Sequence, residues 1–300
     1  MHSRRLRHFL AVYEHHSLGR AAEELHVTQP ALSKSIQQLE GELKVKLFER
    51  TPGGMVPTLY GEALSLHAKV IEAEMQNAAR EIATLSGAAK GEITVGVTPS
   101  VAANIVPRTF LKLQEERPGI NLRVMEGLME NHVPALRRGE LDVVIGGWVR
   151  GIHPDLTTEI ILREDILVFA GAQHPLALKP TIQLESLLEY PWVMPPHTQF
   201  WLQLFEKTFI ARGMPPPIPS AVTNSAGFIK AMLTRGNYLS ALPSQLLGSE
   251  REVRVVVALP IAELSVQMDI TATYRKRAIR LSAFDAFMST VKSVCGPVEP

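Results

Sequence analysis

The 300-residue sequence contains a single cysteine, Cys295, so it cannot form an internal disulfide bond. A chain with so little cysteine fits a reducing compartment such as the cytosol. No apolar run reaches the length of a membrane span, and the charged N-terminal residues adjoin no signal-peptide core. These absences predict a cytoplasmic protein with no membrane partner.

The sequence also lacks a strong net charge. The formal charge is +1, and residues 1–60 hold eight Lys and Arg against six Asp and Glu. No general basic surface is therefore expected, and any prediction of DNA binding depends on a specific motif. The length allows two or three domains of ordinary globular composition, with 46% hydrophobic and 20% charged residues.

Motifs for common enzyme chemistry are missing as well. The sequence contains no GxGxxG, GxxxxGK(S/T), GxSxG or HExxH pattern. The ten histidines are scattered, and Cys295 has no neighbouring base that would make it a nucleophile. We therefore predict no catalytic residues, no metal site, no cofactor and no enzymatic activity.

Residues 17–40 have the periodicity of two short helices joined by a tight turn. The first helix follows the candidate N-cap Ser17, and the second follows the candidate N-cap Thr28. Apolar residues recur at helical spacing on one side of each helix: Leu18, Ala21, Ala22 and Leu25, then Leu32, Ile36, Leu39 and Leu43. This pattern predicts a helix-turn-helix, whose second helix enters the DNA major groove.

The opposite side of the second helix carries short or polar residues: Pro30, Ser33, Lys34 and Gln37. Side chains of this kind can reach base edges in a groove. The alternative is an ordinary helical hairpin within a protein core.

The flanking segments complete a winged helix-turn-helix. Residues 4–15 form an amphipathic helix that packs beneath the other two. Residues 45–58 read as two short strands around a Pro-Gly-Gly turn, which predicts a hairpin wing. Lys46 and Arg50 lie where a wing meets phosphates, which predicts phosphate contact; the alternative is solvated surface charge.

Residues 58–86 form one long helical pattern with apolar residues at alternating spacings of four and three. These residues are Leu64, Ala68, Ile71, Met75, Ala78, Ile82 and Leu85. Such a seam is typical of a coiled coil and predicts dimerisation. The alternative is a lone amphipathic helix folded onto its own domain.

After a small-residue hinge, strands and helices alternate, which indicates an α/β fold with a parallel sheet. We expect strands at 93–97, 121–124 and 141–145, and helices at 101–116 and 131–138. A second unit of the same kind contains strands at 166–170, 191–194 and 239–243. Thr98 and Ser100 precede a helix N-terminus, where an anion is favoured, but either could be a simple N-cap.

These parts resemble the LysR-type transcriptional regulators from end to end. The matching residues are 17–22, 28–34, 36, 39–40, 47–50 and 58–61 in the N-terminal part, followed by 91–97, 139–142 and 174–176. The resemblance implies a winged helix-turn-helix, a long dimerising linker helix and a two-lobed α/β effector domain like periplasmic binding proteins. It implies tetramers that bind and bend promoter DNA, with RNA polymerase as a further candidate partner.

The resemblance also implies domain boundaries. The DNA-binding domain would span 1–58, the linker helix 59–87, the hinge 88–91 and the effector domain 92–300. Within the effector domain, one lobe would comprise 92–163 and 269–300, and the other 164–268.

Functional residues are carried over by position. The base-reading positions fall on Gln29, Pro30, Ser33 and Lys34, the backbone-contacting positions fall on Thr28 and Arg50, and we add Gln37 and Lys46 from the face and the wing. Many members have Arg where this chain has Lys34, and Lys lacks the planar fork that recognises guanine. The effector positions fall on Thr98, Ser100, Leu128, Met129, Gly147, Trp148, His197, Thr198, Asn224 and Ser225. The predicted effector is a small anion such as a carboxylate.

A protein of another class, a small-molecule-binding protein or enzyme with an incidental helical N-terminus, is the competing hypothesis. Retardation of specific DNA in a gel distinguishes the two.

Overall fold

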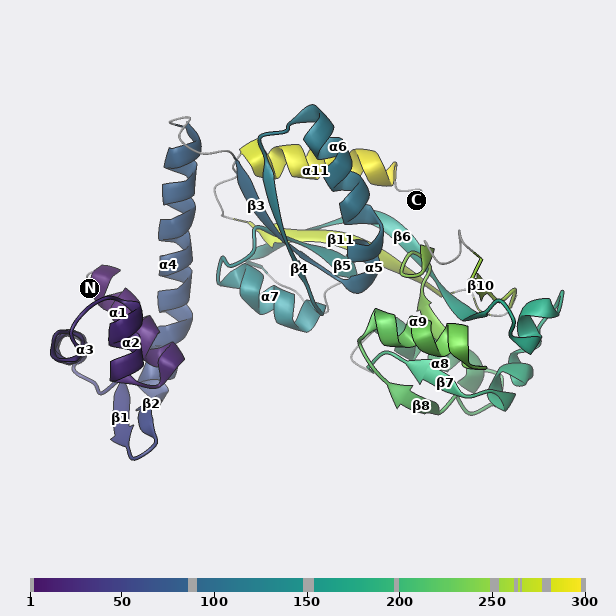
Figure 1. The fold of residues 1–300 in the computed structure, drawn as a ribbon, viewed down its shortest axis with the longest axis horizontal. Helices are drawn as coiled ribbons and strands as arrows, with labels where there is room; N and C mark the ends of the chain where they lie inside the picture. The colour runs from purple at the N-terminus through teal and green to yellow at the C-terminus, as the bar shows by residue number, and fades with distance from the viewer. Residues whose placement is uncertain are drawn as a thin grey trace. The chain divides into compact units, whose positions relative to one another are not determined.

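The structure is a computed structural model that describes residues 3–85, 91–147, 154–196, 200–248, 254–261, 264, 266–276 and 282–297. The chain forms two compact units, residues 1–91 with 134–141 and residues 92–133 with 142–300 (Figure 1). Within the described ranges, no helix is long and apolar enough to span a bilayer.

The first unit contains three helices, a hairpin and a long helix. Their bounds are α1 (Ser3–His15), α2 (Leu18–Glu24), α3 (Gln29–Leu43), β1 (Phe48–Thr51), β2 (Gly54–Pro57) and α4 (Leu59–Leu85). Both predicted N-caps are confirmed, because Ser17 accepts a hydrogen bond from the Arg20 N–H and Thr28 accepts one from the Ala31 N–H. The winged helix-turn-helix predicted from residues 4–58 is therefore present.

One hydrophobic core joins these elements. Phe9 from α1, Leu32 and Leu39 from α3 and Leu47 before β1 are almost fully buried in it. Leu43 was expected on the same stripe, but it is 39% exposed, because it is the last residue of α3. The polar side of α3 is thus fixed by the burial of its apolar side.

The hairpin is anchored at both ends. The Met55 N–H donates to the His16 carbonyl at 2.8 Å, which ties β2 to the turn between α1 and α2. At the other end, Thr58 Oγ1 donates to the Lys46 carbonyl at 2.7 Å and accepts from the Gly61 N–H at 3.2 Å. The wing therefore has a fixed base on the helical body.

The apolar seam of α4 divides between two environments. Leu64 and Ala68 pack on the core of their own unit. This packing is what the alternative, an amphipathic helix folded onto its own domain, predicts. Ile71, Met75 and Ile82 are 38%, 42% and 68% exposed. Only the later part of the seam is left for a partner helix. The side chain of Leu85 and the hinge residues 88–90 lie outside the described residues.

The second unit is α/β. Its elements are β3 (Glu92–Val97), α5 (Pro99–Ala103), α6 (Ile105–Glu116), β4 (Asn121–Glu126), α7 (Met129–Arg137), β5 (Val143–Gly147), β6 (Leu156–Gly171), η1 (Pro175–Leu178), η2 (Leu184–Glu189), β7 (Trp192–Met194), α8 (Phe200–Ile210), β8 (Pro219–Val222), α9 (Ala226–Arg235), β9 (Ser240–Pro243), β10 (Val256–Ala258), β11 (Val266–Arg275) and α11 (Ser282–Cys295). The helix expected at 101–116 is interrupted at Asn104, whose φ of −135° and ψ of −63° are not helical.

The large sheet has the strand order β10-β6-β11-β5-β3-β4, and β9 also pairs with β6. The parallel pairing predicted from the βαβ pattern holds for β3 with β4 and β5. It is wrong for β6 and β9, which pair antiparallel with each other, and β6 also pairs antiparallel with β10 and β11. Strand β11 pairs antiparallel with β5 as well. Strands β7 and β8 form a separate parallel pair.

Two long strands run through two separate hydrophobic cores. Strand β6 contributes Ile161 to the first core and Ile166 and Val168 to the second. Strand β11 contributes Ile270 to the first core and Val266 to the second. Each of these two strands therefore runs from one core into the other, and the two strands are hydrogen-bonded to each other in antiparallel register.

Two glycine substitutions test the anchoring of the hairpin. Gly61→Ala should destabilise the N-terminal unit by roughly 1–3 kcal/mol, because the added Cβ would lie 2.3 Å from the Leu47 carbonyl oxygen. Gly41→Ala on α3 meets nothing within 4 Å and should stabilise by about 0.5–1 kcal/mol through helix propensity. Thermal unfolding followed by circular dichroism measures both. Equal effects of the two substitutions would contradict the close approach at Gly61.

Candidate functional site

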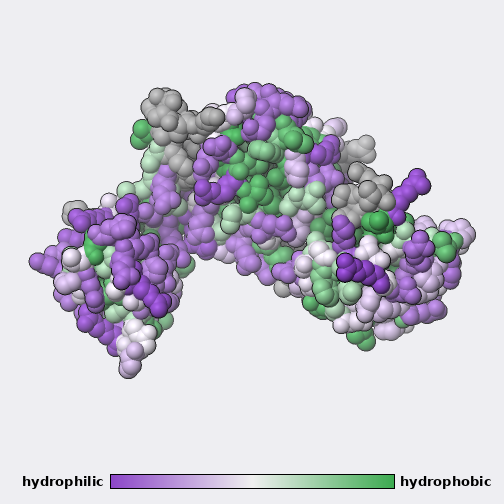
Figure 2. Space-filling model, in the orientation of Figure 1, coloured by the Kyte–Doolittle hydropathy of each residue, from purple (hydrophilic) through white to green (hydrophobic). Residues whose placement is uncertain are grey.

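The predicted reading face lies on the polar side of α3. Thr28, Gln29, Pro30, Lys34 and Gln37 are exposed. Figure 2 shows a mainly hydrophilic surface over α1 to α3. A helix that buries one side and presents exposed polar groups on the other has the layout of a recognition helix.

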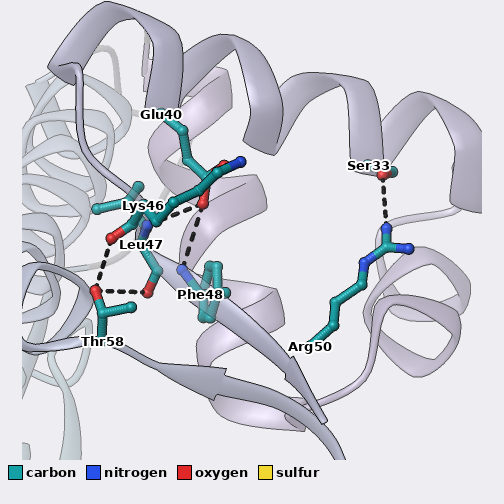
Figure 3. Close-up of polar contacts among 7 residues, drawn as sticks. All are labelled: Ser33, Glu40, Lys46, Leu47, Phe48, Arg50 and Thr58. Carbon is teal, nitrogen blue, oxygen red and sulfur yellow. Dashed lines mark hydrogen bonds and ion pairs between the residues drawn. The ribbon is translucent and has the colours of Figure 1, made fainter.

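The wing reaches this face through one side chain. Arg50 is exposed on β1, and its Nη2 donates to Oγ of the half-buried Ser33 at 3.3 Å (Figure 3). The structure thus brings together two residues predicted to contact DNA, one from the helix and one from the hairpin. The bond leaves other guanidinium N–H groups of Arg50 for a phosphate.

Glu40, which the sequence analysis did not identify as functional, holds the wing on α3. Its carboxylate is buried and accepts from the Leu47 N–H at 2.9 Å and the Phe48 N–H at 3.4 Å. Lys46 Nζ lies 2.7 Å from the same carboxylate (Figure 3). Lys46 is therefore an exposed residue whose charge is paired with Glu40. The sequence signal for this role was the position of Glu40, a charged residue four positions after Ile36 and next to the apolar stripe.

A second contact fixes α3 from the side of α1. The buried His8 lies with Nδ1 2.8 Å from Ser35 Oγ. Burial, and then the positive charges of Arg4 and Arg7, lower the pKa of His8, so the imidazole is neutral near pH 7. Ser35 follows Ser33 and Lys34 closely, so this bond helps to set the rotation of α3.

Thr98 and Ser100, the first predicted effector residues, do not act as simple N-caps. Thr98 occupies the cap position of the five-residue α5, but its side chain makes no capping bond and its Oγ1 is buried without a partner in the described structure. Ser100 is buried, and its hydroxyl lies near enough to the carboxyl of Glu164 to lower the pKa of that group. The helix that begins here is shorter than the predicted helix 101–116, because α5 ends at Ala103.

Gly146 marks a close approach between Thr98 and Met129. A Cβ at Gly146 would lie 2.6 Å from Thr98 Cγ2 and 2.7 Å from Met129 Sδ. Gly147 faces Met268, and the half-buried Leu128 precedes Met129 in the loop after β4. Two predicted positions, Thr98 and Met129, therefore lie close to each other beside Gly146.

Other predicted effector residues are not brought to this place. Asn224 and Ser225 are exposed, and Ser225 Oγ accepts from the Phe228 N–H at 3.2 Å, which makes it the N-cap of α9. In the part of the chain that the structure describes, no hydrogen bond links either residue to Thr98 or Ser100. Trp148, His197 and Thr198 lie outside the described residues.

Glu164 is the residue at this place that the sequence analysis missed. It lies on β6 and is only 2% exposed, and its Oε1 accepts from the Gln245 N–H at 2.8 Å. Its Oε2 is buried without a partner in the described structure. Burial raises the pKa of Glu164 to about 7, and the charge of Asp165 adds to this, whereas the Gln245 N–H and the Ser100 hydroxyl oppose it. Glu164 stands between Arg163 and Asp165 in the sequence, so no local pattern set it apart from its charged neighbours.

Comparison with known proteins gives matches over nearly the whole chain. Residues 3–62 match the family model of the bacterial regulatory helix-turn-helix protein, lysR family, and residues 86–296 match that of the LysR substrate binding domain. The RuBisCO operon transcriptional regulator of Allochromatium vinosum is 31% identical over 291 residues, 97% of this chain and 95% of that protein. The uncharacterized HTH-type transcriptional regulator YdcI of Escherichia coli (strain K12) is 30% identical, covering 86% of this chain and 85% of that protein.

Solved structures show the same fold. CbnR, a LysR family transcriptional regulator, has a TM-score of 0.74 at 20% identity, covering 99% of this chain and all of that one. Full-length CbnR in complex with its target DNA also has a TM-score of 0.74, at 21% identity, with 98% of this chain covered and 100% of that one.

The pH dependence of stability tests the burial of Glu164. A pKa of about 7 means that the folded chain binds this proton more tightly than the unfolded chain, whose ordinary value is 4.5. The free energy of unfolding of the wild type should therefore fall as the pH rises from about 4.5 to 7. Glu164→Gln has no carboxyl to ionise at this position, so its free energy of unfolding should not show this fall. The variant should match wild type near pH 4.5 and exceed it by about 3 kcal/mol at pH 8.

Thermal unfolding at several pH values measures the difference, with exposed Glu185→Gln as the matched control. A Glu164→Gln melting temperature that stays at the wild-type value across the whole range would contradict a buried, protonated carboxyl.

Proposed function

The chain belongs to the LysR family of bacterial transcriptional regulators, and from that premise we propose how its residues read DNA and respond to an effector. Members of this family are DNA-binding transcription regulators with an effector-binding domain, and they are not enzymes. In this proposal, the chain works in the cytoplasm as a dimer of dimers on a pseudo-palindromic promoter site, where RNA polymerase is a candidate partner.

The observation that carries the DNA-binding proposal is the Arg50–Ser33 contact beside the exposed polar side of α3. Gln29, Pro30, Ser33, Lys34 and Gln37 face the bases in this proposal. Thr28, Lys46 and Arg50 face the phosphates, with Arg50 reaching across from the wing. The weak local charge means that specificity depends on this face rather than on general attraction to DNA.

The proposed domain division is the one predicted from the resemblance: 1–58, 59–87, 88–91 and 92–300. The two hydrophobic cores joined by β6 and β11 support two lobes, 92–163 with 269–300 and 164–268. A small anionic effector binds at Thr98, Ser100, Leu128, Met129 and Gly147 and biases the arrangement of the lobes. Trp148, His197, Thr198, Asn224 and Ser225 complete the proposed set.

Exposed apolar residues support self-association. On α4 they are Ile71, Met75 and Ile82. In the second unit, Phe110, Leu111, Val124 and Met125 are 37–65% exposed on α6 and β4, where Figure 2 shows a hydrophobic area. Two separate apolar surfaces are what a dimer of dimers requires.

Alanine substitutions on α3 test the reading face. Lys34→Ala and Ser33→Ala should weaken binding to the promoter region upstream of the protein's own gene by about 1–3 kcal/mol each, and binding to random DNA much less. Gly41→Ala adds a methyl group on α3 that meets nothing within 4 Å, so its ratio of specific to random binding should stay at the wild-type value. Gel shifts at several stated salt concentrations measure the ratio. Equal losses on both DNAs would show that Ser33 and Lys34 contact only phosphates.

Charge substitutions on α4 test the dimer. Ile71→Asp places a carboxylate in the proposed seam and should convert dimers to monomers, because a charge is costly in an apolar interface. Gln76→Asp puts the same charge on an exposed position off the seam and should leave the dimer intact. Light scattering measures the mass. An unchanged mass for Ile71→Asp would place the dimer interface elsewhere.

A further inference from the structure

The region around Ser100 contains several polar atoms that the folded chain does not satisfy. Thr98 Oγ1, Asn104 Oδ1 and Glu164 Oε2 are all buried without a hydrogen-bond partner in the described structure. Native proteins rarely leave such atoms unpaired, and a group of them calls for a bound molecule or water. Thr98, Ser100 and Asn104 lie within one seven-residue segment, and the Ser100 hydroxyl lies near the carboxyl of Glu164.

Glu164 is held between segments of the two hydrophobic cores. Ser100 follows β3 of the first core, whereas Gln245 follows β9 of the second, and both approach the same carboxyl. The Ser244 N–H adds a bond to the Asp165 carbonyl at 2.9 Å. The carboxyl therefore occupies a fixed position where the two cores meet.

The charges around Glu164 favour its neutral form. Asp165 is the neighbouring acid on β6, with Gln267 Nε2 at 2.8 Å from its Oδ1. Arg163 is engaged with Asp269 at 3.3 Å on the paired strand β11. No basic group contributes to the shifted pKa of Glu164 in the described structure. An ionised carboxylate here would be buried without a cation, which is costly.

A neutral carboxyl is a donor. With its proton on Oε2, Glu164 presents an O–H that has no acceptor in the described structure, and the Thr98 hydroxyl is a second donor in the same condition. Two buried neutral donors suit an anionic oxygen, because hydrogen bonds to a charged acceptor are stronger in a poorly solvated site. The flexible Met129 thioether lies against Gly146 beside Thr98 and can be displaced by a ligand.

We propose that Glu164 is an effector-binding residue whose protonated carboxyl donates a hydrogen bond to the anionic group of the effector beside Thr98, so that the effector and one proton bind together. The inference rests on the proposed effector site and adds to it a residue, a ligand chemistry and a dependence on pH. The proton goes from solvent to Glu164 Oε2, and no covalent bond other than that O–H is formed.

The test uses the full-length protein with acetate, succinate and benzoate as probes and their amides as neutral counterparts. Isothermal titration calorimetry between about pH 6 and 8.5, in buffers of different ionisation enthalpy, gives the affinity and the number of protons taken up. For wild type, at least one carboxylate should bind, with affinity falling about tenfold per pH unit above pH 7 and uptake approaching one proton. The matching amide should bind more weakly and without this dependence.

Three variants make the result specific. Glu164→Gln keeps a neutral donor but cannot titrate, so it should bind the same carboxylate with an affinity independent of pH and no proton uptake. Ser100→Ala removes a hydroxyl that lowers the pKa of Glu164, and should move the loss of affinity to higher pH. Glu185→Gln, which alters an exposed acid, should behave as wild type.

The outcomes that overturn the inference are separable from failure of the proposed function. A carboxylate that binds wild type and Glu164→Gln with the same pH dependence and proton uptake would leave the effector site standing and remove Glu164 from it. Ethylamine binding that strengthens above pH 7 in wild type alone would show that Glu164 binds cations. Absence of binding by every carboxylate would reject the anionic effector and this inference together, while gel shifts on the same preparation still report DNA binding.

Discussion

Glu40 lies buried at the end of α3, where its carboxylate accepts hydrogen bonds from two consecutive backbone N–H groups and pairs with Lys46. A buried carboxylate bonded in this way ties the recognition helix to the first residues of β1. Arg50, two residues after Phe48, is consequently held beside Ser33. The reading face is therefore a composite of helix and wing, and its geometry exists before DNA is bound. Such preorganisation reduces the entropy that binding must overcome.

The effector domain depends on a different constraint, the antiparallel pairing of β6 and β11 through both hydrophobic cores. Glu164 lies on one of these strands, and its carboxyl is approached by a segment from each core. In the proposed mechanism, a ligand or proton at Glu164 acts at the place where the two cores are joined.

Helical features of the fold were predictable from the sequence because they depend on local spacing and capping. Ser17, Thr28 and the apolar stripe of α3 follow from residues within a few positions of one another. The antiparallel strands were not predictable in this way, because the partners Ile166 and Val266 are far apart in the sequence and periodicity carries no direction. The first half of β6 was also missed, since Arg163 and Glu164 interrupt its apolar pattern.

The candidate site residues divide in the same way, into those set by local spacing, which were predictable, and those set by distant contacts, which were not. Positions on α3 were identified from helical periodicity and the family resemblance, and the structure places them on one exposed side. Glu40 and Glu164 were not identified, because the significance of a buried acid depends on which distant backbone groups surround it. Ser225 was predicted as an effector position, and in the structure its hydroxyl caps the N-terminus of α9.

Selection of duplexes from a randomised DNA library by the full-length protein tests most directly whether the α3–wing face reads sequence. The account predicts enrichment of a site with two related half-sites about one helical turn, or a multiple of it, apart. Binding to the enriched site should exceed binding to random DNA by about a thousandfold or more at the same salt concentration. Recovery of duplexes with no common sequence, bound no more tightly than random DNA, would contradict it.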